Sequence, residues 1–294
     1  MAQEKIEEKM EEKIFEVAPG EKYVDDRSRL TVFFQVLGRK FWKLISVNFM
    51  FVLFNLPAII ISFILGIYMM ELFFPKLVEA AGQTDLITIL FVFALPLVMF
   101  LMAVPIITVG PAQTGLTYLL RCFSYELPTF LWSDFKDKMK QNMKQGIIVS
   151  LINLFGIVFL LFDLYLYSQL NVSSNVIFPI ANGLLIVVLI IFLMMNLYIY
   201  PMMVTYDLKI KNLYKNAFLF AFAKFLPNLA ILAICLILIV GPSLLIQLTG
   251  NVLVLAIMYV FYLILGFTLP GLIINFFINP VIDKYLQPAP KDAE

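Results

Sequence analysis

Histidine is absent from the sequence and only two cysteines occur among its 294 residues, which removes much of the usual catalytic and metal-binding chemistry. Histidine is the commonest general base and a common metal ligand, and two lone thiols make no metal site. HExxH, GxSxG, P-loop and CxxC motifs are also missing. We therefore predict that the protein is not an enzyme and has no catalytic residues, cofactor or metal.

Charged residues are also scarce. They make up 14% of the chain, whereas hydrophobic residues make up 62%. Soluble domains carry roughly 25% charged residues, so a soluble fold of this length could not bury so much apolar surface. The formal net charge of +1 argues against a nucleic-acid partner. The sequence thus predicts a lipid bilayer as the solvent.

Long runs without charge predict about six transmembrane helices, because one span needs about 20 apolar residues. We expect an all-α, polytopic helical bundle forming a single domain over 30–281. A charged tail, 1–29, precedes it and a second tail, 282–294, follows it. The spans are predicted at 44–69, 87–108, 146–167, 177–203, 228–248 and 252–275.

The distribution of basic residues predicts the orientation. Of the 21 Lys and Arg residues, all except Lys76 fall in the segments 1–43, 109–145, 204–227 and 282–294. Loops rich in Lys and Arg stay in the cytoplasm. Both termini are therefore predicted to be cytoplasmic.

Amphipathic basic segments precede three of the spans, at 30–43, 132–145 and 207–227. In the second, Phe135, Met139 and Met143 share one helical face, and Ser133 is the expected N-cap with Asp134 in the first turn. Such helices lie in the headgroup plane with their lysines towards anionic lipid. We predict three helical hairpins, each entered through an interfacial elbow helix.

The segment 105–121 contains a predicted helix break at Gly110-Pro111, with proline in the first turn of a new helix that ends near Phe123. Ala112 and Gly115 are small residues that allow close helix approach. The segment is either a kinked helix end or a re-entrant element that lines a cavity.

Neutral amides are the main polar groups of the predicted spans, among them Asn48, Asn55, Asn153 and Asn196. Amides in lipid pair with other helices; the alternative is a polar path for a neutral solute. Asp163, the one ionisable residue within a predicted span, is either interfacial or part of a substrate or partner site.

Three blocks resemble the YesL-like family of bacterial integral membrane proteins, whose function is uncharacterised. They are LGRKFWKLI from Leu37 with Asn48 and Asn55-Leu56-Pro57, PIITVGPA from Pro105 with Gly115, Tyr118 and Arg121, and FLWSDF from Phe130 with Asn142 and Lys144-Gln145. The resemblance implies a Gram-positive plasma membrane and an association with carbohydrate uptake systems. It also points to a candidate functional or packing motif: Asn48, Asn55, Pro57, Thr108, Gly110, Pro111, Gly115, Tyr118 and Arg121.

The leading functional hypothesis is a transport-related component, accessory to carbohydrate uptake, whose elbow helices bind permease subunits. Its candidate docking residues are Trp132, Asp134, Phe135 and Asn142. One alternative is a stand-alone carrier for a neutral solute, lined by the four amides. Another is a structural or envelope-stress membrane protein without transport activity.

Overall fold

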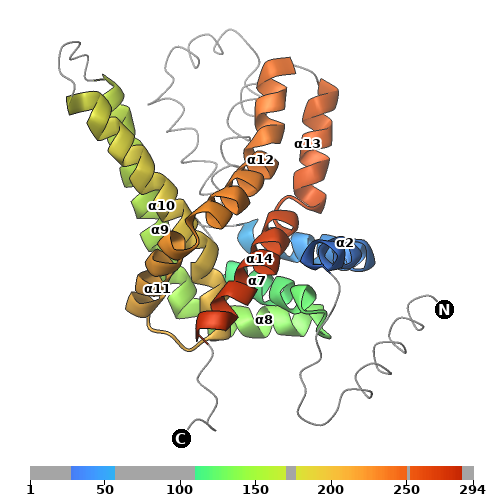
Figure 1. Cartoon of the computed structure of the whole chain (residues 1–294). Helices are drawn as coiled ribbons and strands as arrows, with labels where there is room; N and C mark the ends of the chain where they lie inside the picture. The colour runs from blue at the N-terminus through green and yellow to red at the C-terminus, as the bar shows by residue number, and fades with distance from the viewer. Residues whose placement is uncertain (1–27, 57–109, 170–176, 250–251, 287–294) are drawn as a thin grey trace, which may run out of the picture.

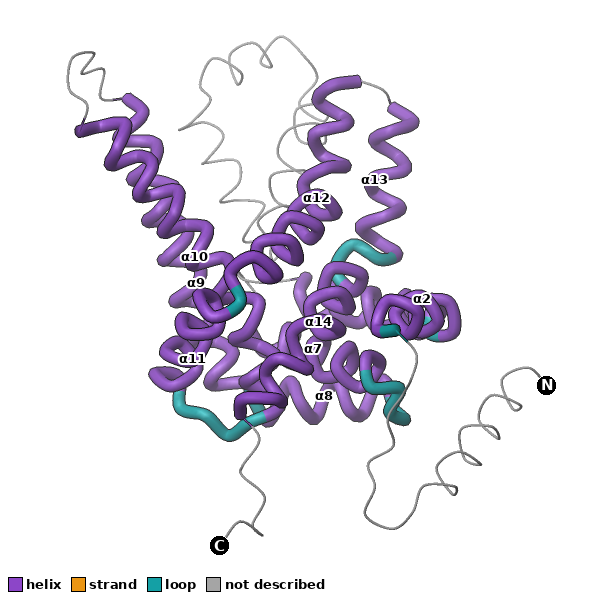
Figure 2. Tube along the Cα trace, viewed as in Figure 1, coloured by secondary structure: helices purple, strands orange, loops and turns teal. Residues whose placement is uncertain are grey.

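A computed structural model describes residues 28–56, 110–169, 177–249 and 252–286. Over these ranges the chain forms helices joined by short loops, and no strand is present (Figure 2). The prediction of an all-α protein is confirmed. The expected tail 1–29 lies almost entirely outside the described residues, and the predicted span 87–108 lies wholly outside them.

The helices are joined by short connections for much of the described chain (Figure 1). An apolar helix, Phe41–Leu56, follows α2 and continues the first predicted span as far as the description reaches. The labelled helices are α2 (Arg29–Arg39), α7 (Gly110–Ser124), α8 (Leu131–Gln141), α9 (Met143–Gln169), α10 (Ile177–Thr205), α11 (Ile210–Ala223), α12 (Phe225–Thr249), α13 (Val252–Ile264) and α14 (Thr268–Leu286).

Three described helices are long and apolar enough to cross a membrane. The spanning segments are Met143–Tyr167 in α9, Pro179–Thr205 in α10 and Phe225–Pro242 in α12. A fourth span is counted if α13 and α14 are taken together, although they meet at an angle of 53°. Several apolar helices establish an integral membrane protein, whereas the full number of six spans stays a prediction.

The predicted span 252–275 needs correction, because it is not one continuous helix. The chain turns at 265–267 between α13 and α14. A Cβ at Gly266 would lie 2.6 Å from the Cα of Tyr262, so the tight turn requires glycine there. More than half of α14 is buried, including Gly271, Asn275 and Asn279. It therefore belongs largely to the protein core.

The three elbow helices are present as α2, α8 and α11. Each is joined to the following apolar helix by a single residue: Lys40, Asn142 or Lys224. This shared junction supports a structural repeat. The elbows are shorter than predicted, because the residues after each junction already belong to the next helix.

The N-cap prediction for α8 was wrong. Phe130 occupies the N-cap position, and the carboxylate of Asp134 accepts a 2.8 Å hydrogen bond from its backbone N–H. Ser133 lies inside the helix and donates to Asp137 at 3.2 Å. Asp134 is in the first turn as expected, where its negative charge also favours the helix dipole.

Helix α7 lies at the centre of the fold and packs against α2, α8, α9, α10 and α14. Twelve of its fifteen residues are buried. The predicted start with proline in the first turn and end near Phe123 are confirmed. Hairpin α9–α10 and the pair α12–α13 extend from this base in diverging directions (Figure 1).

Two glycine contacts allow this close packing. A Cβ on Gly110 would overlap the backbone of Gly146 at the start of α9. A Cβ on Gly115 would lie 2.7 Å from the carbonyl oxygen of Phe135 in α8. The close approach expected at Gly115 is therefore present, and α8 is the helix that approaches.

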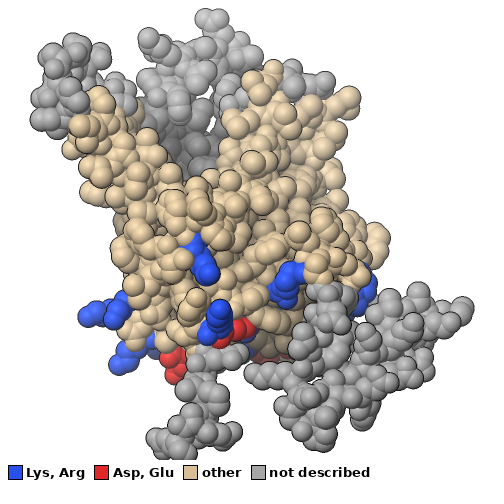
Figure 3. Space-filling view, viewed as in Figure 1, with Lys and Arg blue, Asp and Glu red and all other residues tan. Residues whose placement is uncertain are grey.

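Most charged side chains of the described residues gather at the end of the molecule where α7, α8 and α11 lie. Figure 3 shows Lys and Arg side chains around this end, whereas the visible surfaces of the helices that extend away from it show no charged side chain of either sign. We call this part the basic end. It is the boundary expected between the bilayer and water.

Candidate functional site

Asn48 holds the break between α13 and α14. Its side chain is completely buried, and its amide nitrogen donates to the carbonyl oxygens of Tyr262 and Leu263 at 3.1 and 2.7 Å. Its amide oxygen accepts from the backbone N–H groups of Phe267 and Thr268 at 3.0 and 3.2 Å. One side chain thus supplies partners for backbone groups that the interrupted helix leaves unpaired.

Asn55 behaves differently, although it lies on the same helix and is also completely buried. Its amide donates at 2.7 Å to the carbonyl of Phe51, one turn earlier, and its oxygen has no hydrogen-bond partner among the described residues. The two further candidates, Pro57 and Thr108, lie outside the described residues.

The remaining amides of the hypothetical solute path also contact protein. The Asn153 oxygen accepts from the Tyr214 hydroxyl of α11 at 3.0 Å, whereas its nitrogen is buried and meets no acceptor within the described ranges. Asn196 donates to the carbonyl of Phe192 in its own helix at 2.8 Å, and its oxygen is likewise unpaired. Asn48 and Asn153 thus bond to neighbouring helices.

Arg121 is part of a polar cluster around Asp283, near the end of α14. One guanidinium nitrogen of Arg121 donates to both carboxylate oxygens of Asp283 at 3.0 Å. The hydroxyls of Tyr125 and Tyr206 donate to the same carboxylate at 2.6 and 2.9 Å. The side chains of Arg121 and Asp283 are both 18% exposed. This cluster joins α7, α14 and the end of α10.

Burial and the nearby carboxylate both favour the neutral tyrosines. Burial, followed by the hydrogen bond to Asp283, raises the pKa of Tyr206 to about 12. The same two causes raise the pKa of Tyr125 well above its usual value. Both hydroxyls therefore act as hydrogen-bond donors near neutral pH. Sequence reasoning had missed Tyr125, Tyr206 and Asp283, because only Arg121 lies in a recognisable motif.

Glu126 lies just after α7 in a left-handed backbone conformation, with φ of 57°. The backbone N–H groups of Glu126 and Leu127 bond to the carbonyls of Phe123 and Cys122, which is the Schellman pattern at a helix end. Glycine is the usual residue at this position. The Glu126 carboxylate instead forms an ion pair with Arg39, at the end of α2.

Tyr118 of α7 lies beneath Lys138 of α8. The Lys138 ammonium is 4.8 Å from the centre of the Tyr118 ring, in cation–π geometry. The Thr114 hydroxyl, one turn earlier, donates to the Pro111 carbonyl of its own helix at 2.7 Å and shares this hydrogen with the Lys138 carbonyl at 3.2 Å. The α7 motif therefore positions α8 through Gly115, Thr114 and Tyr118.

The four docking candidates are not equivalent. Trp132 is 54% exposed and contacts Phe54, with ring centres 5.6 Å apart. Asp134 caps α8. Phe135 is completely buried, stacked on Phe54 and packed against Gly115, so it is not available to a partner. Asn142 donates to the carbonyl of Lys138 at 3.0 Å and stabilises the elbow.

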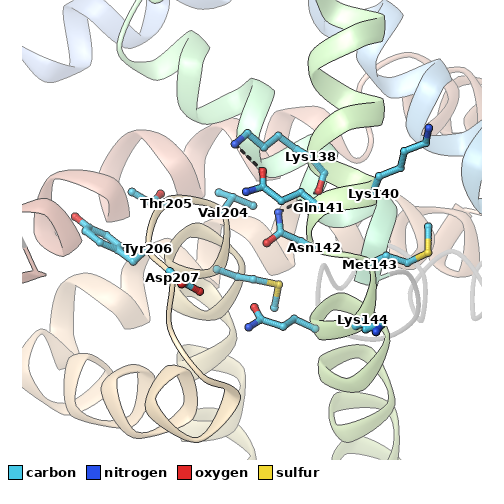
Figure 4. A pocket seen from close by; sticks show the side chains of 12 residues that line it. Lys138, Lys140, Gln141, Asn142, Met143, Lys144, Val204, Thr205, Tyr206 and Asp207 are labelled. Atoms are coloured by element: carbon cyan, nitrogen blue, oxygen red, sulfur yellow. Dashed lines mark hydrogen bonds between the residues drawn. The ribbon is translucent and has the colours of Figure 1, made fainter.

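A pocket of about 730 Å³ opens beside Asn142, between the α8–α9 junction and the end of α10. Figure 4 shows these two walls facing one another. Its lining is mostly polar: Lys138, Lys140, Gln141, Asn142, Met143, Lys144, Gln145, Met203, Val204, Thr205, Tyr206 and Asp207. Among the described residues, no three Cys, Asp or Glu side chains are grouped to hold a metal ion.

Comparison with known proteins adds no relative. No protein-family model, no curated protein and no solved structure matches this chain. The resemblance to the YesL-like family thus stays a prediction based on the three sequence blocks.

Proposed function

We propose that this protein is a non-enzymatic component of a bacterial, Gram-positive plasma membrane that assists a carbohydrate uptake system by binding a permease subunit. The supporting observation is the outer edge of α8, where Phe130 and Trp132 are 79% and 54% exposed. Tryptophan is enriched among the residues that contribute most to protein interfaces. This edge is the surface that the permease contacts.

Helix α8 is packed firmly against α7, which suits a docking surface. Phe135 anchors α8 in the core, and the glycine contact at Gly115 brings the backbones of α7 and α8 together. A surface held in place before binding loses less conformational entropy on association. The basic end, to which α8 belongs, faces the cytoplasm in this proposal.

Affinity purification from native membranes tests the role. The full chain is extracted in mild detergent, and co-purifying proteins are quantified by mass spectrometry. We expect a carbohydrate permease subunit in stoichiometric amounts, and its loss with Trp132→Ala. Trp42→Ala is the matched control, because Trp42 is 78% exposed and lies just after another elbow. Recovery of the chain alone, or equal loss with both variants, contradicts the role.

A second candidate is a stand-alone carrier for a neutral solute. The observation favouring it is that the amide oxygens of Asn55 and Asn196 and the amide nitrogen of Asn153 are buried and have no hydrogen-bond partner in the part of the chain that the structure describes. A bound sugar could supply hydroxyls to such groups. Uptake of labelled sugars into liposomes containing only this protein supports the carrier, and uptake no faster than in empty liposomes rules it out.

A further inference from the structure

The pocket at the α8–α9 junction has the chemistry of an anion site. Three of its lining residues are lysines, Lys138, Lys140 and Lys144, and one is acidic, Asp207. Within the part of the chain that the structure describes, neither Lys140 nor Lys144 is paired with a carboxylate. Figure 4 shows the Lys140 side chain extending away from Asp207. The lining therefore keeps excess positive charge.

Hydrogen bonds fix the walls of this pocket. The Gln145 amide donates to the carbonyl of Leu208 at 3.1 Å and ties α9 to the loop after α10. The Lys138 ammonium donates to the side-chain oxygen of Gln141 at 2.9 Å while it lies over Tyr118. Asn142 closes the elbow through its bond to the Lys138 carbonyl. The pocket is thus formed by the packing of three helices.

The pocket lies where two membrane spans end. The spanning part of α9 begins at Met143, and that of α10 ends at Thr205; both residues line the pocket. An anionic headgroup is the negative group most abundant at such a boundary, and basic pockets between transmembrane helices bind headgroups of this kind.

An apolar stripe leads from the pocket along α9. Met143 is followed at intervals of four residues by Ile147, Leu151 and Phe155, and the four side chains are 42%, 45%, 47% and 69% exposed. This spacing places them on one helix face. Phospholipid acyl chains can contact this exposed apolar stripe, whereas a free anion has no apolar part that would contact it.

From these observations we infer that the pocket binds the headgroup of an anionic phospholipid. The lysines contact the phosphate, and the acyl chains lie along the stripe from Met143 to Phe155. The site shares Asn142 with the candidate docking residues but involves neither Trp132 nor a permease subunit, so its test does not depend on the docking role. The bound headgroup would contact both the α8–α9 junction and the end of α10 and so stabilise their packing.

Native mass spectrometry of the purified full chain tests the site. The protein is titrated in detergent with phosphatidylglycerol or phosphatidylcholine of the same chain length. We expect phosphatidylglycerol to bind at least tenfold more tightly. Replacing Lys138 and Lys144 by glutamine should weaken its binding roughly ten- to thirtyfold. Asp207→Asn should strengthen it several-fold, because it removes the negative charge from the lining.

The matched control replaces Lys211 and Lys215 by glutamine. These lysines carry the same charge at the basic end, on α11, but do not line the pocket. Their loss should change binding less than twofold. Equal weakening by both double variants overturns the inference, because it indicates general surface charge. So does equal affinity for the two lipids.

Inorganic phosphate distinguishes a lipid from a free anion. Millimolar phosphate should not displace phosphatidylglycerol, since it has no acyl chain to contact the α9 stripe. Displacement at that concentration overturns the assignment to lipid. Introducing a charge on the stripe with Leu151→Lys should weaken the binding of phosphatidylglycerol at least fivefold. An unchanged affinity also contradicts the assignment to lipid. Circular dichroism confirms that each variant remains folded.

Discussion

The amide oxygen of Asn48 accepts a 3.2 Å hydrogen bond from the backbone N–H of Thr268, the first residue of α14. The same side chain reaches back to two carbonyls near the end of α13. A residue on the first described apolar helix therefore determines how a helix some 220 residues later is interrupted. This relationship explains why an asparagine is buried there.

Asn48→Ala is expected to destabilise the protein by on the order of 2–4 kcal/mol, because each buried backbone group that loses its partner costs about 1–3 kcal/mol. Asn55→Ala is the matched control on the same helix. It removes one bond within its own helix and should cost less. Unfolding by sodium dodecyl sulfate, followed by circular dichroism, measures both. Equal losses contradict the role assigned to Asn48.

Spin labels measure the bend itself. Labels at Leu253 on α13 and Tyr285 on α14 occupy exposed sites. The two native cysteines, both buried, are first replaced by alanine. The distance distribution should broaden with Asn48→Ala and stay narrow with Asn55→Ala. A narrow distribution in both variants shows that the break does not need Asn48.

Gly146→Ala should be severely destabilising, because its new Cβ would lie 2.7 Å from the carbonyl carbon of Gly110 and force α7 and α9 apart. A loss of about 3 kcal/mol or more is expected for such an overpacked contact. Gly183→Ala is the control, since no atom of the described residues lies within 4 Å of a Cβ there. It should be neutral or slightly stabilising. Comparable melting temperatures for the two variants contradict the packing at α7.

A double-mutant cycle measures how much the ion pair between Glu126 and Arg39 contributes to stability. Glu126→Gly relieves a left-handed conformation that costs a non-glycine residue about 1 kcal/mol, but it also removes the ion pair. The substitution should therefore stabilise an Arg39→Met background and give less benefit, or a net loss, in the native protein. Unfolding free energies of the four proteins test this. Identical effects in the two backgrounds show that the ion pair contributes nothing.

The cluster around Asp283 predicts that the stability of the folded protein decreases at alkaline pH. The pKa of Tyr206 is about 12 in the folded protein and about 10 in an unfolded chain. The folded state therefore holds this proton more tightly, so the stabilisation is complete below pH of about 10 and is lost as pH rises towards 12.

Tyr206→Phe removes the titrating hydroxyl, so the stability of the variant no longer depends on this proton. The stability difference between native protein and variant should shrink between those pH values, as measured by thermal unfolding in detergent. Tyr285→Phe serves as the control, because Tyr285 is an exposed tyrosine on the helix that carries Asp283. A difference that stays constant over this range contradicts a raised pKa for Tyr206.

The sequence was sufficient for the features that depend on local pattern. Uncharged runs located the apolar helices α9, α10 and α12. The spacing of Phe135 and its lysine neighbours located an elbow. Gly110-Pro111 located the start of α7. These signals lie within one or two turns of the residues that they place, so no knowledge of the tertiary fold is needed.

The features that depend on distant contacts could not be predicted. Nothing near Asp283 indicates that it meets Arg121, which lies 162 positions earlier. The same holds for Asn48 and the break before Thr268. Phe135 was expected at a docking surface because it belongs to a basic elbow helix and to the FLWSDF block of the resemblance, although it also lies on the apolar face of that helix. That face contacts α7 in the protein core, a fact that periodicity alone does not reveal.

The most direct test of the proposed role is site-specific photo-crosslinking in native membranes. A photoreactive amino acid is placed at Trp132 in one strain and at Trp42 in another, and the crosslinked proteins are identified by mass spectrometry. The account predicts a carbohydrate permease subunit crosslinked at position 132 and not at 42. Crosslinks at position 132 to lipid alone, or the same proteins at both positions, would contradict it.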